Sequence, residues 1–320
     1  MTIHPTNNNG DSNQEMSPHT HTNIHSYAHS HAHSHDSIGD IRLAFFLNLG
    51  FTFLEIVGGF WTNSLAILSD AVHDLGDSIS LGLAWFLEHF AGRQGDWRYS
   101  YGYRRFSLLG ALINAIILVG GSVYVIANAV PRIIQPEPTN GVGMVLFAIV
   151  GVAVNGLAVL RLRRNKSLNA KVIAWHLLED VLGWLAVLIV AVILSFTDFY
   201  ILDPLLSLAI STYVLINAVR NLWETLSIFL QATPRGLELE EIEAHLSAVE
   251  GVCSTHHTHL WSLDGEHHVL STHLVVDENS TKTDLQRIKS DARQSLRPFQ
   301  LSHITIEIEN GKGDCAMDVN

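Results

Sequence analysis

The chain has 320 residues, of which 48% are hydrophobic and only 16% are charged, and its formal net charge is −12. Typical soluble domains carry about 25% charged residues, so this composition indicates a membrane protein. Nucleic-acid binding calls for basic patches, and the acidic balance therefore argues against nucleic acid as a partner.

The first 39 residues are polar and rich in histidine. Eight histidines precede Asp36, and the first basic residue is Arg42. A segment with neither a basic start nor an apolar stretch is not a signal peptide, and we predict a disordered tail over residues 1–39. Its histidines could bind metal loosely, as a local reservoir. The alternative is a tail that only solubilises the protein.

Six apolar segments follow the tail. A helix needs about 20 apolar residues to cross the roughly 30 Å hydrocarbon core of a bilayer. The segments cover residues 41–61, 65–90, 106–130, 142–161, 171–196 and 200–221. We therefore predict an all-α membrane domain of six transmembrane helices over residues 40–222.

The short loops between these segments differ in basic charge. The second and fourth loops are rich in Arg and Lys, the third has only Arg132, and the first and fifth have none. Basic loops stay on the cytoplasmic side of a membrane. We therefore predict that these two loops and both termini are cytoplasmic.

Residues 232–310 have the composition of a soluble domain. We predict, in order, a helix, two strands, a helix and a strand at residues 237–248, 252–261, 267–276, 281–296 and 303–309. This αββαβ order predicts a small α+β domain in the cytoplasm, followed by a tail over residues 311–320. The two cysteines, Cys253 and Cys315, lie in this part and suit a reducing compartment.

Two of the apolar segments contain histidine followed four residues later by aspartate. The pairs are His73 with Asp77 and His176 with Asp180. Residues at i and i+4 lie on one face of a helix, so two such helices side by side supply two nitrogen and two oxygen ligands. That set suits tetrahedral zinc. The alternative is that these groups hydrogen-bond one another or lie near water, but ionisable residues inside a membrane are costly and usually functional.

Other polar residues accompany these pairs. Asp74 and Glu179 are each one residue away from the site face, so we expect both to point away from the metal. Asp70 precedes His73 by nearly one turn and could lie along an access path. We expect Glu55 and Asn48 of the first segment to form hydrogen bonds between helices; the alternative is that they line the access path.

The pair Asp203-Pro204 opens the sixth segment. Aspartate is a preferred N-cap residue, and proline is favoured in the first helical turn. We therefore predict that Asp203 caps the helix in which it lies.

Histidines also gather in the C-terminal domain. Strict alternation along a strand would place His257 and His259 on one face and His256 on the other, while Glu307 and Glu309 share a face of the last strand. Such donors could form a second metal site, although histidines on surface strands are often harmless.

The chain resembles the cation diffusion facilitator family, in its zinc-efflux branch. The resemblance rests on residues 63–77, 101–106, 176–180, 203–208 and 251–261. It implies a homodimer with cytoplasmic metal-binding domains that exports metal in exchange for protons. It also implies that His256, His273, Glu307 and Glu309 are ligands in the C-terminal domain.

Together these features predict a proton-coupled antiporter in a bacterial inner membrane that exports Zn²⁺, with Cd²⁺ or Co²⁺ as further substrates. Zinc would be the transported and regulatory ion rather than a catalytic cofactor, and we expect no enzymatic activity. The alternatives are an exporter of Co²⁺ or Ni²⁺ and a membrane metal sensor. A zinc protease would carry His-Glu-x-x-His on a helix, which this sequence lacks.

Overall fold

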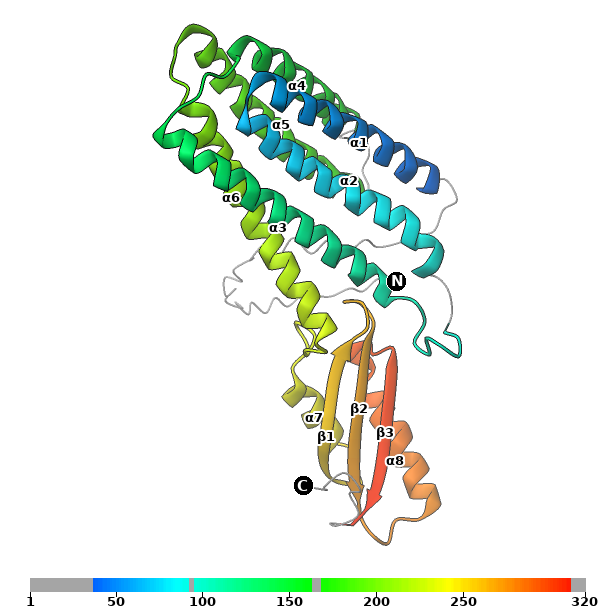
Figure 1. The fold of residues 1–320 in the computed structure, drawn as a ribbon. Coiled ribbons are helices and arrows are strands. Elements are labelled where there is room, and N and C mark those ends of the chain that lie inside the picture. The colour runs from blue at the N-terminus through cyan, green and yellow to red at the C-terminus, as the bar shows by residue number, and fades with distance from the viewer. Residues whose placement is uncertain (1–36, 92–94, 163–167, 312–320) are drawn as a thin grey trace, which may run out of the picture. The chain divides into compact units, whose positions relative to one another are not determined.

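A computed structural model describes residues 37–91, 95–162 and 168–311 (Figure 1). The predicted histidine-rich tail and C-terminal tail therefore lie almost wholly outside the described residues. The six predicted apolar segments are all helical. They form α1 (Ser37–Thr62), α2 (Leu65–Ala91), α3 (Arg105–Ile134), α4 (Gly141–Leu162), α5 (Leu168–Phe196) and α6 (Leu202–Phe229). α6 continues seven residues or more beyond the predicted end of its segment.

Within the described residues, five of these helices are long and apolar enough to cross a membrane, namely α1, α3, α4, α5 and α6. α2 is also long, with 27 residues. It is less apolar because Asp70, Asp74 and Asp77 lie within two of its turns. Of the two helices that carry a His-x-x-x-Asp pair, α2 thus has a composition less typical of a membrane span than α5.

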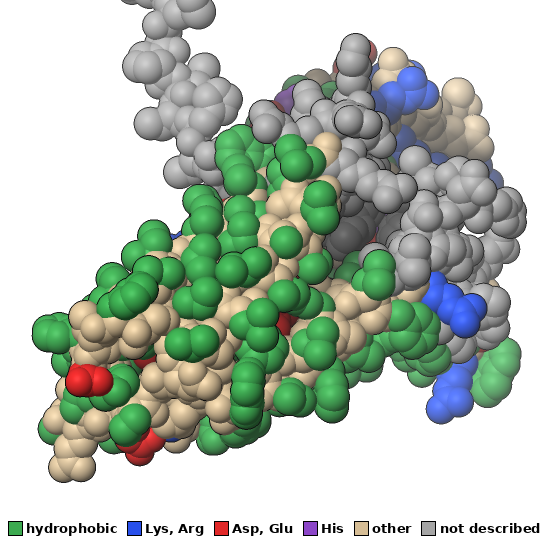
Figure 2. Space-filling view, turned by 90° about the horizontal axis from the view of Figure 1, so that it is seen from above, with side chains coloured by type: hydrophobic (Ala, Val, Ile, Leu, Met, Phe, Trp, Pro, Cys, Tyr) green, Lys and Arg blue, Asp and Glu red, His purple; other side chains and the backbone are tan. Residues whose placement is uncertain are grey.

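Large hydrophobic side chains cover the outside of the helical part. Figure 2 shows them spread over one face with few charged side chains among them. Leu47, Phe53, Phe60, Ile189 and Trp223 are each more than 60% exposed. Apolar surface of this extent is not found on soluble monomers. It faces lipid, and the protein is an integral membrane protein.

Small side chains let the helices approach one another. α3 and α6 pack together; α3 buries Ala115, Ser122 and Ala129, and α6 buries Ala218 as well as Ser211, whose hydroxyl lies 2.7 Å from that of Ser69 on α2. Small residues are typical of such contacts in membranes, where close van der Waals packing replaces the hydrophobic effect.

The tightest such contact joins α4 and α5 at Gly151. A Cβ atom added there would overlap the ring of Trp184, which is 1% exposed. We expect Gly151→Ala to destabilise the chain by about 1–3 kcal/mol, because the ring cannot move away without disturbing the core. Thermal unfolding of the purified chain in detergent measures this. Gly156→Ala on the same helix is the control, since no atom lies within 4 Å of its added Cβ; an equal loss in both variants would contradict the packing explanation.

Asp203 caps a different helix from the one predicted. The N-cap of α6 is Ile201, and Asp203 lies inside the first turn, fully buried. Its carboxylate accepts hydrogen bonds from Ser64 Oγ at 2.5 Å, Leu65 N at 2.8 Å and Ala66 N at 3.3 Å. These donors open α2, so the negative charge stabilises the N-terminus of α2. The prediction chose the wrong helix because sequence does not show which helix start lies opposite Asp203.

The C-terminal domain follows the predicted αββαβ order. Its elements are α7 (Leu239–Ser247), β1 (Val252–Ser262), β2 (His268–Val276), α8 (Lys282–Ser295), a 3-10 turn (Arg297–Phe299) and β3 (His303–Asn310). The sheet order is β1-β2-β3, with β1 antiparallel and β3 parallel to β2. α7 and α8 bury Ile242, Leu246 and Ile288 against Leu270 and Leu274 of the sheet. The prediction of a small domain with a three-stranded sheet and helices is confirmed.

Candidate metal centres

The first candidate centre lies between α2 and α5. His73 Nε2 lies 3.9 Å from Asp77 Oδ2 on the same helix and 3.7 Å from Asp180 Oδ1 on α5. Ligands held about 2.0–2.1 Å from a tetrahedral zinc ion are themselves roughly 3.3 Å apart, so small side-chain movements would suffice to bind one. The side chain of His176, the fourth predicted ligand, lies outside the described residues.

The neighbouring acids of this centre differ in position. Glu179 is exposed, and Asp74 is buried and interacts electrostatically with Glu55 of α1. The described ion pairs of His73 are with Asp77 and Asp180. Asp70 is buried, and its Oδ1 lies 3.9 Å from where a Cβ on Gly183 of α5 would stand. Asp70 therefore belongs to the contact between α2 and α5, one turn from His73.

A polar seam joins α1 to α2 beside this centre. Asn48 donates hydrogen bonds to the Asp74 carbonyl and to Ser78 Oγ, both at 3.0 Å, and Thr52 Oγ1 lies 3.4 Å from Ser78 Oγ. The prediction of an interhelical hydrogen bond is therefore confirmed for Asn48. Glu55 differs, because neither of its carboxylate oxygens has a hydrogen-bond partner among the described residues.

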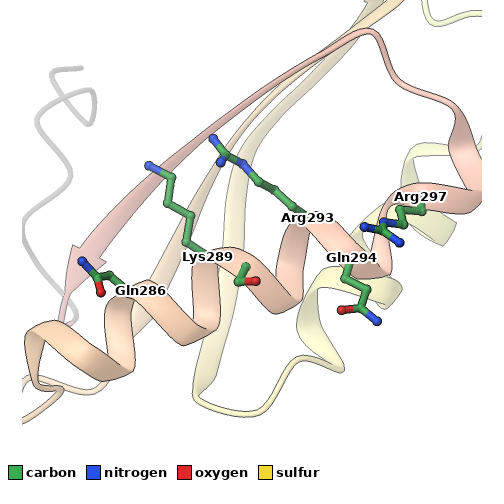
Figure 3. A pocket seen from close by; sticks show the side chains of 6 residues that line it. Gln286, Lys289, Arg293, Gln294 and Arg297 are labelled. Atoms are coloured by element: carbon green, nitrogen blue, oxygen red, sulfur yellow. The ribbon is translucent and has the colours of Figure 1, made fainter.

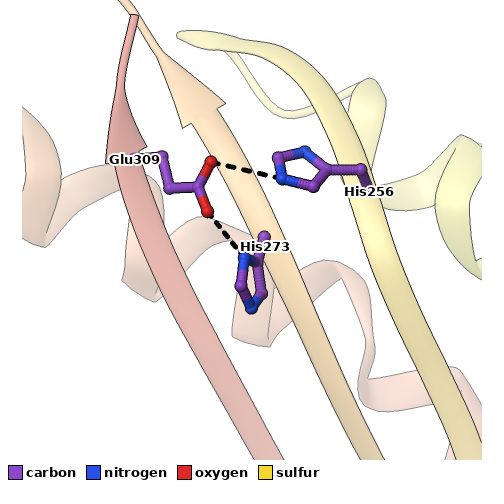
Figure 4. A group of neighbouring side chains, drawn as sticks. All are labelled: His256, His273 and Glu309. Carbon is purple, nitrogen blue, oxygen red and sulfur yellow. Dashed lines mark hydrogen bonds and ion pairs between the residues drawn. The ribbon is translucent and has the colours of Figure 1, made fainter. Parts of the chain in front are cut away.

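The second candidate centre lies on the sheet of the C-terminal domain (Figure 4). His273 Nδ1 lies 2.6 Å from Glu309 Oε1, and His256 Nε2 lies 3.2 Å from Glu309 Oε2. One ligand atom from each residue falls within 4.8 Å of the others. His273 and Glu309 are 5% and 7% exposed. Such burial favours a metal site over a chance ion pair between surface side chains.

The fourth predicted ligand of this centre, Glu307, occupies its edge. Its Oε2 lies 3.5 Å from His273 Nε2, but its side chain is 60% exposed. Parallel pairing sets Glu307 directly opposite His273 in the register of β2 and β3. The structure thus brings His256, His273 and Glu309 together and leaves Glu307 beside them.

The prediction for the faces of the β1 histidines is wrong. The ladder between β1 and β2 has a bulge between His256 and His259, and His257 has a φ of 47°. A bulge inserts an extra residue and interrupts alternation. The rings of His256 and His257 therefore both lie 5.4 Å from that of His273, while His259 is exposed. His257 is a neighbour of the site that the sequence pattern missed.

Two other histidines lie apart from this cluster. His267 Nδ1 lies 2.8 Å from Asp264 Oδ2 in the turn before β2, and burial lowers the pKa of His268. The one sizeable hollow described, about 330 Å³ beside α8, is lined by Gln, Ser, Lys and Arg side chains (Figure 3). These residue types are not zinc ligands, so the hollow is not a metal site.

Comparison with known proteins gives the family. Residues 41–230 match the cation efflux transmembrane domain, and residues 234–311 match the cation efflux protein cytoplasmic domain. The chain belongs to the cation efflux family. It is 30% identical over 273 residues to a "Cadmium, cobalt and zinc/H(+)-K(+) antiporter" of Bacillus subtilis, covering 84% of this chain and 88% of that protein.

Two further relatives match this cation efflux protein over a similar share of its length. A "Zinc transporter ZitB" of Pectobacterium atrosepticum is 33% identical over 276 residues, or 85% of each chain. A "Metal cation efflux system protein CzcD" of Cupriavidus metallidurans is 30% identical over 271 residues, or 84% of this chain and 85% of its own length. The family is one of metal-ion transporters, in agreement with the resemblance carried by the motifs.

Zinc binding at the cluster of His256, His273 and Glu309 can be tested directly in this cation efflux protein. We expect His273→Ala to remove one zinc ion per chain, or to weaken its binding at least roughly 10-fold, because the variant loses the most buried nitrogen ligand. Competition between the purified chain and a zinc-chelating dye measures both the number of ions and their affinity. His259→Ala, an exposed change on the same strand, is the control; unchanged zinc binding in His273→Ala would rule the site out.

Proposed function

We propose that this cation efflux protein exports Zn²⁺ from the cytoplasm in exchange for protons, with Cd²⁺ and Co²⁺ as further substrates. The gathering of His73, Asp77 and Asp180 between α2 and α5 carries this proposal. One imidazole and two carboxylates, inside a lipid-facing helical part, form a donor set that suits zinc. His176 would supply a fourth ligand from α5. The printed names of the three relatives support these metals.

The proposed topology has six crossings, with residues 40–222 in a bacterial inner membrane and both termini in the cytoplasm. At about 1.5 Å per residue, the 27 residues of α2 are long enough for the sixth crossing. Asp70 and Asp74 of α2 are buried and Asp77 contacts His73, which supports a position away from lipid for this face of the helix. The basic second and fourth loops support the orientation. Residues 1–39 and 311–320 would be cytoplasmic tails.

The proposed mechanism is alternating access. Only neutral histidine and ionised aspartate are good ligands, so a metal ion from the cytoplasm displaces protons from His73, His176 and the two carboxylates. The helices then open to the other side, where protons compete for the same groups and release the metal. Histidine titrates in the range that this competition needs. The word antiporter in the Bacillus subtilis relative's name supports exchange.

Residues 232–310 would act as a cytoplasmic regulatory domain in a homodimer. The match to the family's cytoplasmic domain supports this role. Zinc at His256, His273 and Glu309, with Glu307 beside it, would report cytoplasmic zinc to the transporter. The proximity of these donors in the structure supports a regulatory ion distinct from the transported one.

Metal uptake into proteoliposomes tests the proposal. The purified chain is reconstituted, a pH gradient is imposed, and Zn²⁺, Cd²⁺, Co²⁺ and Ni²⁺ are supplied in turn. We expect zinc uptake that depends on the gradient and stops when the gradient is collapsed. Uptake of Co²⁺ or Ni²⁺ without zinc would favour an exporter of another metal. Binding without uptake of any metal would favour a sensor and contradict transport.

A further inference from the structure

Glu55 is a buried acid without a role in the proposed metal centre. It lies on α1, is 1% exposed, and neither carboxylate oxygen has a hydrogen-bond donor among the described residues. Burying an ionised carboxylate without a partner costs several kcal/mol. Asn48 and Thr52, on the preceding turns of α1, are both hydrogen-bonded. The polar seam thus ends at Glu55, and helix packing alone does not explain why this acid is buried.

The charged groups that face Glu55 are acidic. Asp74 and Asp70 of α2 act on it most strongly, and Asp180 of α5 adds to their field. α4 packs against α1 through Phe147 and has no ionisable residue between positions 141 and 160. Two facing carboxyl groups form a hydrogen bond only when one of them carries a proton. Glu55 therefore needs a positive charge close by, or a proton of its own.

A divalent cation bound by His73, Asp77 and Asp180 would supply such a charge. Asp180 contributes to that centre and also to the field at Glu55, and Asp74 lies next to His73 in the chain. A divalent cation there would favour ionised carboxyl groups nearby, because the buried surroundings screen its charge poorly. Occupation of the metal centre and protonation of Glu55 therefore oppose each other.

We propose that Glu55 carries one of the protons exchanged for the metal ion. While the metal centre is empty, Glu55 is a neutral acid. When a divalent cation binds, the Glu55 O–H bond breaks, the proton leaves to water, and the new carboxylate offsets one of the two positive charges. After the metal leaves, a proton from the opposite side restores the O–H bond. This step rests on the proposed exchange of metal for protons. In that exchange, Glu55 couples proton release to metal binding and is not itself a metal ligand.

Proton release on zinc binding tests the step directly. Zinc is added to the purified full-length chain in weakly buffered detergent, and a pH indicator counts the protons released per ion bound. We expect Glu55→Gln still to bind zinc, but more weakly than wild type and with about one proton fewer released, since zinc ligands and coupled acids lose protons on binding. Glu55→Asp, which still titrates, should restore that proton. Equal release by Glu55→Gln and wild type would overturn the proposal.

A second measurement can contradict the proposal with the wild-type chain alone. Infrared difference spectra of the wild-type chain should show the loss of a protonated-carboxyl C=O band when zinc binds, and Glu55→Gln assigns that band. Absence of the band in the wild type would overturn the proposal for Glu55. Absence of any zinc-coupled proton flux in wild-type proteoliposomes would instead overturn the proposed function, so the two failures are distinguishable.

Discussion

Asp180→Ala should abolish gradient-driven zinc uptake into proteoliposomes, with a loss of at least about 100-fold. The substitution removes the only described ligand that links α5 to His73 on α2, at 3.7 Å. Loss of one of the proposed zinc ligands is expected to cost several kcal/mol of binding, and every 1.4 kcal/mol is a factor of ten. Initial rates of uptake at fixed internal and external pH measure the loss.

Glu179→Gln is the matched control for Asp180→Ala. It changes the adjacent acid on α5, which is exposed and lies on another face of the helix. We expect uptake within about 2-fold of wild type, as for substitutions away from a site. Wild-type uptake by Asp180→Ala would contradict the assignment of the metal centre.

Asp203→Ala should produce the largest loss of stability among the variants considered. The change leaves two backbone N–H groups and the Ser64 hydroxyl without an acceptor in a buried position. Each unsatisfied buried group costs about 1–3 kcal/mol, so we expect the three together to cost at least roughly 3 kcal/mol. Thermal unfolding of the purified chain in detergent would show this as a fall in Tm.

The control for Asp203→Ala is a nearby exposed acid. Asp198 lies just before α6 and accepts a hydrogen bond from Tyr200 at 2.8 Å, outside the packed helices. We expect Asp198→Ala to change the free energy of unfolding by less than about 0.5 kcal/mol. A similar Tm for both variants would show that Asp203 does not hold α2 and α6 together.

The sequence predicted those features that depend on local pattern. Apolar runs of membrane length predicted the helical segments α1 to α6, and alternation with turn residues predicted the strands and helices after Leu239. Spacing on one helix placed His73 and Asp77 together, because i and i+4 geometry needs no knowledge of the rest of the fold. The identity of the metal and the count of six crossings stay predictions.

The remaining features depend on which segments meet. Asp203 caps α2 because α6 starts beside it, although 138 residues separate Asp203 from Leu65. His257 joins His256 near His273 because a bulge interrupts the strand. Histidine is enriched at positive φ, but nothing in the sequence distinguishes His257 from the neighbouring histidines in this respect. Glu55 and Asn48 are both polar residues in an apolar segment, so the sequence gives them the same prediction. In the structure, only Asn48 has hydrogen-bond partners on α2 among the described residues.

Simultaneous recording of zinc and proton flux is the most direct test of proton-coupled export. Proteoliposomes containing the wild-type chain would hold a zinc-sensitive dye and a pH-sensitive dye, with no pH gradient at the start. The account predicts that an inward zinc gradient drives zinc in and protons out, and that both fluxes vanish in Asp180→Ala. Zinc entry without any proton movement in the wild type would contradict it.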